Sequence, residues 1–305
     1  MKKISDIHFC ILISTIFLGS CQEKPEWEVT VSLEFDNEDK AIKEKKRFDF
    51  EEILPVSESS GAQGGDCWGD YFFQFVANNS IVRVYDLSLK TLVQTIRIPT
   101  SEKGFVYNCH CNTVCFGTEY YDTEDIFPLI YVSTGYASNG YTGALVYRII
   151  SDQGTFSIKL VQTLKFPADE SSWTEFVPGD EYAYLCYTSE RVIFKVPMPK
   201  LKDGNVVVIN RNAAFETYQF TPQPDWMSSS RNQDRLFYQG KILLVSGVPQ
   251  CGEASVFVIL NLESLERERI EDFKEIRLNN ESESIFVWRG DICVAFIDRI
   301  VKLIL

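Results

Sequence analysis

Hydrophobic and polar positions repeat along this chain in the pattern of a β-hairpin. The clearest copy runs from Gly69 to Leu87, where the apolar run YFFQFVA is followed by a polar tip, Asn78, Asn79 and Ser80, and then by IVRVYDL, which alternates with period two. Two runs rich in β-branched and aromatic residues around an Asn/Ser tip are typical of antiparallel strands joined by a tight turn. The stretch therefore predicts a hairpin.

The same pattern occurs four times in the chain. Each copy begins with a Gly-Asp or Gly-Lys pair that follows a large aromatic residue. The pairs are Gly69-Asp70, Gly179-Asp180, Gly240-Lys241 and Gly290-Asp291, and the aromatic residues are Trp68, Phe176, Tyr238 and Trp288. Glycine followed by Asp is typical of turns. Each pair is therefore predicted to join a first strand to the hairpin, and its Asp is expected to serve the turn rather than a reaction.

A second repeat has nearly identical letters. LVQTIRIP at 92–99 and LVQTLKFP at 160–167 lie 68 positions apart, and each is predicted to be the outermost strand of a unit. Together the repeats divide the chain into units of about four strands, at 61–99, 108–167, 172–221, 229–278 and 282–305. Repeated small sheets that cannot bury their own faces are the signature of a β-propeller.

The predicted fold is therefore an all-β propeller with five blades. A ring with a sixth, degenerate blade is the alternative count. The last unit has only three strands, so a strand at 27–35 or 47–54 is expected to complete it and to close the ring. Closure removes the open edges that a long sheet exposes. A pair of β-sandwiches is the alternative, but it would not explain four recurrences of one pattern.

The first twenty residues are expected to be a signal peptide rather than part of the fold. Lys2 and Lys3 precede an apolar run at 9–18, which is short for a membrane span. The run ends in Leu-Gly-Ser before Cys21, the order of a bacterial lipoprotein signal in which the cysteine becomes lipidated. We therefore predict a signal at 1–20, a lipidated Cys21 with a tether at 21–26, and one propeller domain at 27–305. An ordinary secretory signal is the alternative.

Charge and histidine content exclude several classes of function. Removing the signal takes Lys2, Lys3 and Asp6 from 30 basic and 43 acidic residues and leaves a net charge of −14. A strongly acidic protein is poorly suited to nucleic acid or to an anionic lipid surface. His110 is the one histidine left, which excludes sites that need two imidazoles, including most catalytic zinc sites. No Gly-rich phosphate loop, nucleophile elbow or calcium loop is present, so no cofactor is expected.

The cysteines suggest packing more than chemistry. Seven remain besides Cys21, an odd number, and Cys109, Cys111 and Cys115 flank His110 in a cluster that resembles a metal site. Strand alternation would place the three thiols on one buried face and His110 on the other. The paired C-x-x-C spacing of zinc sites is missing, so no metal is predicted. A strained disulfide between Cys109 and Cys111 is an open alternative.

These features together resemble the TolB-like β-propeller lipoproteins of Bacteroidota-type bacteria. The resemblance rests on the lipoprotein signal before Cys21, on the hairpin GDYFFQF with IVRVYDL, and on HCNTVCFG with FPLIYVST. It implies a propeller anchored in the cell envelope, as an outer-membrane lipoprotein that faces the periplasm or the surface. The group is usually described as six-bladed, and it carries no assigned reaction.

Ligands of propellers usually bind at the mouth of the central channel, which the first strands line. Polar residues at the start of these strands are therefore the binding candidates: Gln63, His110, Asn112, Glu175, Arg231 and Asn232. A concave pocket with a few polar groups is the usual ligand site. Carboxylates near the same strands suggest a second chemistry, because glycosidases use pairs of acids. These acids are Asp66, Glu175, Asp234 and Glu283.

The sequence thus favours a binding or scaffold lipoprotein. It would be held to the bilayer by acylated Cys21 and would present its faces to an envelope protein or a glycan. The alternative is a carboxylate-dependent enzyme acting on glycosides, with its site at the channel mouth. Whether the chain is an enzyme at all stays open at this point.

Overall fold

The computed structural model describes residues 48–56, 61–77, 80–104, 109–135, 141–167, 174–187, 192–220 and 231–305. The predicted signal peptide, Cys21, the tether and the candidate strand at 27–35 lie outside these residues. The described part contains strands and short 3-10 helices but no α-helix. None of its helices is long and apolar enough to cross a membrane.

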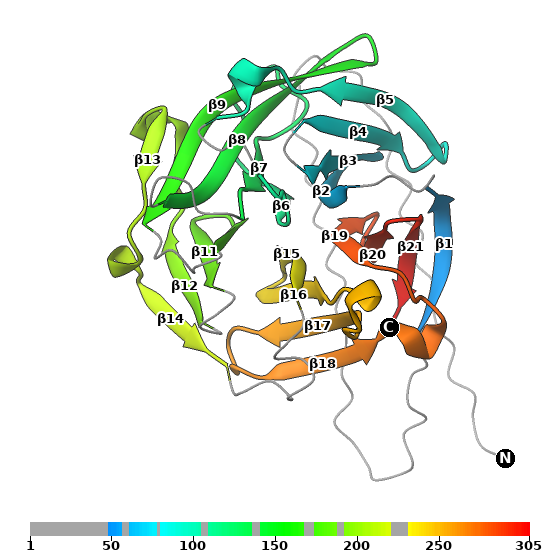
Figure 1. The fold of residues 1–305 in the computed structure, drawn as a ribbon. Helices are drawn as coiled ribbons and strands as arrows, with labels where there is room; N and C mark the ends of the chain where they lie inside the picture. The colour runs from blue at the N-terminus through cyan, green and yellow to red at the C-terminus, as the bar shows by residue number, and fades with distance from the viewer. Residues whose placement is uncertain are drawn as a thin grey trace, which may run out of the picture. The chain divides into compact units, whose positions relative to one another are not determined.

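The described strands form five sheets arranged around one axis, which confirms the five-bladed β-propeller (Figure 1). Blade 1 contains β2 (Ala62–Trp68), β3 (Tyr71–Val76), β4 (Ile81–Asp86) and β5 (Thr91–Arg97). Blade 2 contains β6 (Val114–Phe116), β7 (Ile130–Ser133), β8 (Tyr141–Asp152) and β9 (Thr155–Pro167). Blade 3 contains β10 (Thr174–Pro178), β11 (Tyr182–Tyr187), β12 (Val192–Pro197) and β14 (Glu216–Gln219).

Blade 4 contains β15 (Asn232–Tyr238), β16 (Lys241–Ser246), β17 (Val256–Asn261) and β18 (Arg267–Asp272). Blade 5 contains β19 (Ser282–Trp288), β20 (Asp291–Phe296), β21 (Arg299–Ile304) and β1 (Asp49–Pro55). Short 3-10 helices occur in the connections, at η2 (Thr100–Glu102), η3 (Leu201–Asp203), η4 (Arg211–Ala213), η5 (Pro249–Cys251) and η6 (Phe273–Ile276).

The ring closes as the sequence predicts. β1 pairs antiparallel with β21, with Asp49 opposite Ile304, so the strand near the N-terminal end of the described chain completes the C-terminal blade. Of the two candidate strands, the one predicted at 47–54 is therefore the closing strand. Figure 1 shows β1 at the outer edge of blade 5, beside β21.

The repeated glycine pairs form the turns between the first and second strands, as predicted. Gly69, Gly240 and Gly290 have positive φ values, and no atom would obstruct an added Cβ at any of them. The recurrence of glycine at these three positions therefore follows from backbone conformation rather than from packing. Asp70 also links blades, because its carboxylate accepts hydrogen bonds from Trp288 Nε1 at 2.9 Å and from Arg289 Nε at 3.1 Å.

One predicted edge strand is not at an edge. β5 is the outermost strand of blade 1 as expected, but β9 is covered by a fifth strand, β13 (Val206–Val208). This strand leaves blade 3 and pairs parallel with β9, with Val206 opposite Thr163. The expectation that 160–167 closes its blade was therefore wrong, because the connection between β12 and β14 is long enough to reach the neighbouring blade.

The core consists of five apolar clusters, and each lies between two neighbouring blades. Between blades 1 and 5, for example, the rings of Phe72 and Phe286 stack with centroids 4.4 Å apart. Between blades 2 and 3, Tyr131 packs against Phe176 with centroids 5.4 Å apart. Because a blade buries its faces only against its neighbours, the ring is stable only when all five blades are present.

Candidate functional site

The first strands of the blades surround the central axis, where Figure 1 shows β2, β6, β15 and β19 innermost. Three of these strands contain a β-bulge near their start. The bulges lie between Ala62 and Gly65 in β2, between Asn232 and Asp234 in β15, and between Ser282 and Ser284 in β19. A bulge inserts a residue and redirects side chains. The inserted positions carry the polar residues Gln63, Gln233 and Glu283, all of which are buried.

The approach of blade 2 to the axis depends instead on the backbone conformation of Cys111. Cys111 has a φ of 58°, a left-handed conformation that is uncommon for a residue with a side chain. Its carbonyl accepts a hydrogen bond from Gly64 N at 2.9 Å. A Cβ at Gly64 would stand 2.1 Å from the carbonyl oxygen of Asn112, so only glycine allows the two backbones to approach this closely. Blades 1 and 2 thus join backbone to backbone beside His110.

His110 and Asn112 connect blade 2 to blade 4. His110 Nδ1 is hydrogen-bonded to Asn112 Oδ1, and Asn112 Nδ2 donates to the carbonyl of Asn232 at 2.8 Å. With Oδ1 as the acceptor, Nδ1 carries the imidazole proton and Nε2 is the acceptor nitrogen. Burial lowers the pKa of His110, although the bond to Asn112 acts in the opposite direction. The imidazole is therefore held neutral at physiological pH.

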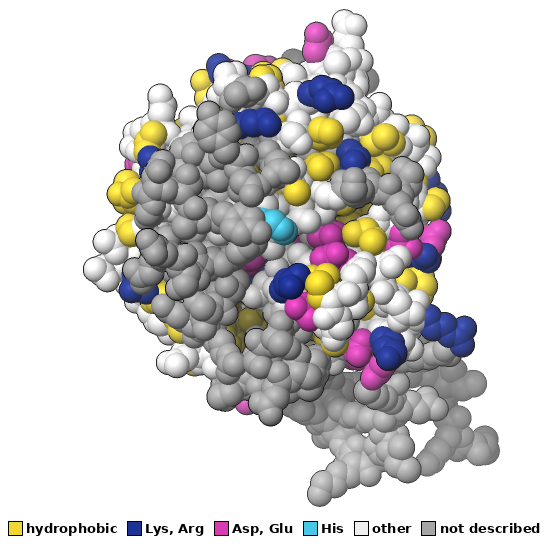
Figure 2. All heavy atoms as spheres, viewed as in Figure 1, with side chains coloured by type: hydrophobic (Ala, Val, Ile, Leu, Met, Phe, Trp, Pro, Cys, Tyr) yellow, Lys and Arg dark blue, Asp and Glu magenta, His cyan; other side chains and the backbone are white. Residues whose placement is uncertain are grey.

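Charged and polar residues of blades 4 and 5 form a second cluster next to Asn232. Gln233 Nε2 donates to Glu281 Oε1 at 2.5 Å, and Arg231 Nε lies 3.5 Å from Glu253 Oε1. Burial raises the pKa of Glu281, and burial followed by the charge of Glu281 raises the pKa of Glu283 well above its usual range. Figure 2 shows histidine, acidic and basic side chains together near the middle of this face. We call this set of residues the channel mouth: Gln63, His110, Asn112, Arg231, Asn232, Gln233, Glu253, Glu281 and Glu283.

A buried ion pair joins the first strands of blades 3 and 4, β10 and β15. Arg235 Nη1 lies 2.8 Å from Glu175 Oε2, and the two side chains are 8% and 0% exposed. The thiol of Cys115 donates to the carbonyl of Arg235 at 3.1 Å. Glu175, a sequence-based candidate for the mouth, thus lies in the interior with a cationic partner. Its place is that of a buried structural charge rather than of a group presented to a ligand.

Two further acids near the axis link neighbouring first strands. Asp66 accepts hydrogen bonds from Cys67 N at 2.7 Å and from Phe116 N of blade 2 at 2.7 Å. Asp234 accepts from Arg235 N at 2.7 Å and from Ile285 N of blade 5 at 3.0 Å. Because both oxygens of each carboxyl are bonded to backbone, these two acids connect blades. This use of Asp66 and Asp234 counts against their role as a catalytic pair.

The position of Asp66 has a measurable consequence. Burial raises its pKa from 3.8 to about 7, even though the bonds from Phe116 and Cys67 lower it. Between these values the folded chain binds more protons at this carboxyl than the unfolded chain does, so stability falls as pH rises from about 4 to about 7. We expect Asp66→Asn to flatten this slope by up to about 1.4 kcal/mol per pH unit. Urea unfolding of both proteins across this range measures it, and an unchanged slope would contradict the assignment.

The cysteines divide differently from the expected pattern. Cys109 and Cys111 lie in the apolar cluster between blades 1 and 2, whereas Cys115 lies in the cluster between blades 3 and 4. The expectation of one common face was wrong, because the left-handed conformation of Cys111 interrupts strand alternation before β6 begins. No group of three or more His, Cys, Asp or Glu side chains suited to a metal ion occurs among the residues that the structure describes.

The structure brings five of the six sequence-based candidates to the channel mouth. These are Gln63, His110, Asn112, Arg231 and Asn232. Gln233, Glu253 and Glu281 were missed, and Glu283 was noted only as an acid near a first strand. For Gln233, Glu281 and Glu283 the one signal is position, one residue from the start of β15 or β19, since a bulge cannot be read from alternation. Glu253 lies in the connection between η5 and β17 and carries no such signal.

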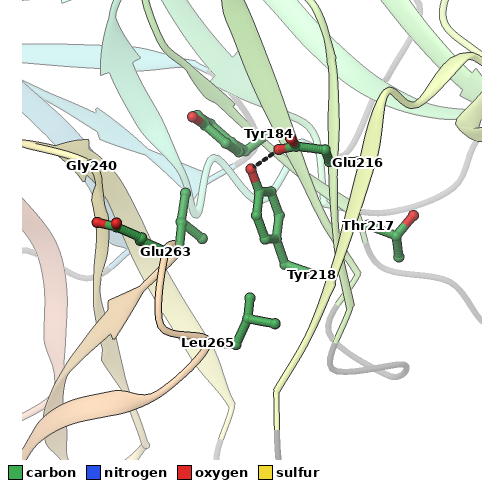
Figure 3. A pocket seen from close by; sticks show the side chains of 8 residues that line it. Tyr184, Glu216, Thr217, Tyr218, Gly240, Glu263 and Leu265 are labelled. Atoms are coloured by element: carbon green, nitrogen blue, oxygen red, sulfur yellow. Dashed lines mark hydrogen bonds between the residues drawn. The ribbon is translucent and has the colours of Figure 1, made fainter.

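A concave feature lies away from the axis, between blades 3 and 4. It is a groove of about 550 Å³ lined by Tyr184, Glu216, Thr217, Tyr218, Gly240, Leu262, Glu263 and Leu265. Figure 3 shows the ring of Tyr218 in its middle, with the hydroxyl bonded to Glu216. Lys195 Nζ pairs with the same carboxylate at 3.1 Å. The polar groups of this wall are therefore already paired with one another.

Comparison with known proteins identifies the fold alone. No protein-family model matches the chain, and no curated protein matches it. Among solved structures it is similar to a glutaminyl cyclase of Myxococcus xanthus, with a TM-score of 0.51, 11% identity, and coverage of 84% of this chain and 95% of that one.

Two further solved structures are similar at a lower level. A glucose dehydrogenase has a TM-score of 0.46 and 9% identity, with 83% of this chain and 98% of that one covered. A glycosyl hydrolase of Bacteroides ovatus has a TM-score of 0.44 and 10% identity, with 81% and 84% covered. These proteins differ in activity, so the shared architecture carries no reaction to this chain.

Proposed function

We propose that this chain is an envelope-anchored lipoprotein of the TolB-like propeller kind, which binds a protein or glycan partner at the channel mouth. One observation carries the proposal: polar side chains from four blades lie there, and those of blades 2, 4 and 5 are held by hydrogen bonds. His110 and Asn112 are bonded to each other and onward to the backbone of Asn232, and Gln233 is bonded to Glu281. Groups fixed before a partner arrives lose little entropy on binding.

The groups of the channel mouth indicate what the partner should offer. Gln63 Oε1 and Glu283 Oε2 are buried oxygens without a hydrogen bond within the described chain. Their strands are adjacent, since Ser284 Oγ donates to the carbonyl of Gln63 at 3.0 Å. Buried acceptors favour a ligand that supplies N–H or O–H donors. Hydroxyl groups of a glycan and amide or amine groups of a peptide both meet this requirement.

Variants of the channel mouth test the proposal. We expect His110→Ala and Glu283→Gln each to weaken binding at least about tenfold, because a lost hydrogen bond to a charged or buried group costs about 1.5–3 kcal/mol. The measurement is binding of the Cys21→Ser protein, which lacks the lipid anchor, to arrays of bacterial glycans and peptides. Glu216→Gln, in the outer groove, is the matched control and should bind as the parent does.

Two outcomes would count against the proposal. Equal loss with Glu216→Gln would indicate general damage or a site in the groove. Unchanged binding by both mouth variants would place the partner elsewhere on the propeller. The anchor is tested separately in the native envelope, where Cys21→Ser should release the protein from the membrane fraction; retention of that variant would contradict lipidation at this residue.

A carboxylate-dependent enzyme acting on glycosides is the second candidate. It is supported by Glu281 and Glu283, which both lie at the channel mouth with raised pKa values and could deliver a proton. Hydrolysis of aryl glycosides by the parent, lost in Glu283→Gln and kept in Asp66→Asn, would favour this reading. Glutaminyl cyclase activity should be measured in a separate assay, because the chain has a fold similar to that of a glutaminyl cyclase. Binding without turnover of any of these substrates would favour the binding module.

A further inference from the structure

Two thiols that contact each other in the described chain flank His110. Cys111 Sγ donates a hydrogen bond to Cys109 Sγ across 3.4 Å, and both side chains are fully buried. Cys109 Sγ also donates to the carbonyl of Ser133 at 3.6 Å. Three features thus hold the two sulfur atoms side by side. They are the single residue between the cysteines, the packing of both side chains in the apolar cluster between blades 1 and 2, and the hydrogen bond to the carbonyl of Ser133.

The backbone is already arranged for a bond between these sulfur atoms. Cα atoms two positions apart are separated by at most about 7 Å, near the upper limit for a disulfide. The left-handed conformation of Cys111 takes its side chain out of strand alternation, and Gly64 N holds its carbonyl. To form a bond of about 2 Å, the two sulfur atoms must approach each other by about 1.4 Å, which rotation of the side chains supplies without a change of fold.

We propose that Cys109 and Cys111 form a disulfide in the mature protein and that this bond fixes His110 at the channel mouth. The oxidant is a disulfide-bearing thiol oxidant, a small molecule or a thiol oxidoreductase. One cysteine thiolate attacks a sulfur of that disulfide and expels a thiol, and the second cysteine then attacks the mixed disulfide and expels the other. The two cysteines lose two protons and two electrons, and the oxidant is reduced to two thiols.

The timing follows from burial. The thiols are inaccessible once blades 1 and 2 have packed, so the exchange takes place before the ring closes. A loop that encloses one residue restricts the unfolded chain little, since the stabilisation from a disulfide grows with loop length. The bond therefore acts locally, on the backbone of His110, whose ring binds Asn112. Formation of this bond does not depend on what the channel mouth binds.

Peptide mapping tests the bond directly. The full-length protein is purified without reductant, unfolded, alkylated and digested. The mass of the peptide that contains Cys109, Cys111 and Cys115 is then measured by mass spectrometry. We expect two of its three thiols to resist alkylation. Before alkylation, the mass of the peptide should be lower than that of its fully reduced form by two hydrogen atoms. Cys115→Ser is the matched control and should keep the protected pair, which identifies the partners as Cys109 and Cys111.

A second measurement tests the effect on His110. The imidazole titration, followed by NMR, should differ between oxidised and reduced protein, and Cys109→Ser with Cys111→Ser should match the reduced form in both conditions. Full alkylation of all three thiols after refolding in a glutathione redox buffer would overturn the proposed bond. A protected pair with identical titrations would overturn the proposed control of His110.

Discussion

Removal of residues 48–56 is expected to abolish the folded propeller. These residues contain β1 and carry four buried apolar side chains, Phe48, Ile53, Leu54 and Val56, which pack into the clusters on both sides of blade 5. Burying each such side chain contributes about 1.5–3 kcal/mol. Their sum is comparable to the whole stability of an ordinary domain, about 5–15 kcal/mol. Circular dichroism and urea unfolding of the truncated chain should show no cooperative transition.

A circular permutant separates the role of the strand from its place in the sequence. Asp49 lies opposite Ile304, so a two-residue turn can join Leu305 to Phe48 as a hairpin. A chain that begins at Gly61 and ends with this transplanted β1 should fold and unfold cooperatively, as the parent does. A folded truncated chain, or an unfolded permutant, would contradict the view that β1 closes the ring by pairing with β21.

The closing strand was predictable because its evidence lies in repetition. Four copies of one hairpin set the blade boundaries, and a last unit with three strands required a fourth from elsewhere. The same logic failed at β9, where a nearly identical motif has a different neighbour: β5 is an edge strand, whereas β9 is covered by β13. β13 covers β9 because of the length of the connection after β12, and this is a tertiary choice that no local pattern records.

The channel mouth was predictable in position but not in chemistry. Knowing that first strands line a propeller axis was enough to select Gln63, His110 and Asn232. It was not enough to separate them from Glu175, which starts its strand in the same way but points into the interior beside Arg235. The difference arises from bulges and from the φ of Cys111, because each shifts alternation by one residue without a sequence signature.

Arg235→Met is expected to lower the free energy of unfolding by about 3–5 kcal/mol, because it leaves the carboxylate of Glu175 in the protein interior without its guanidinium partner. The two groups are 2.8 Å apart and almost inaccessible, so water cannot replace the lost cation. Urea unfolding at neutral pH measures the loss. The exposed pair of Arg289 and Asp70, with Nη2 and Oδ1 3.0 Å apart, is the control, and Arg289→Met should cost less than about 1 kcal/mol.

The double variant Arg235→Met with Glu175→Leu decides whether the pair contributes stability or specificity. If the interior tolerates apolar side chains of similar volume, the double variant should recover most of the loss, since replacing both partners of a buried pair is often neutral. Recovery would mean that the ion pair persists for what it positions, which includes Cys115 through the carbonyl of Arg235. A loss equal to that of Arg235→Met alone would instead show that the guanidinium stabilises the axis through its other neighbours, including Asp234 and Cys186.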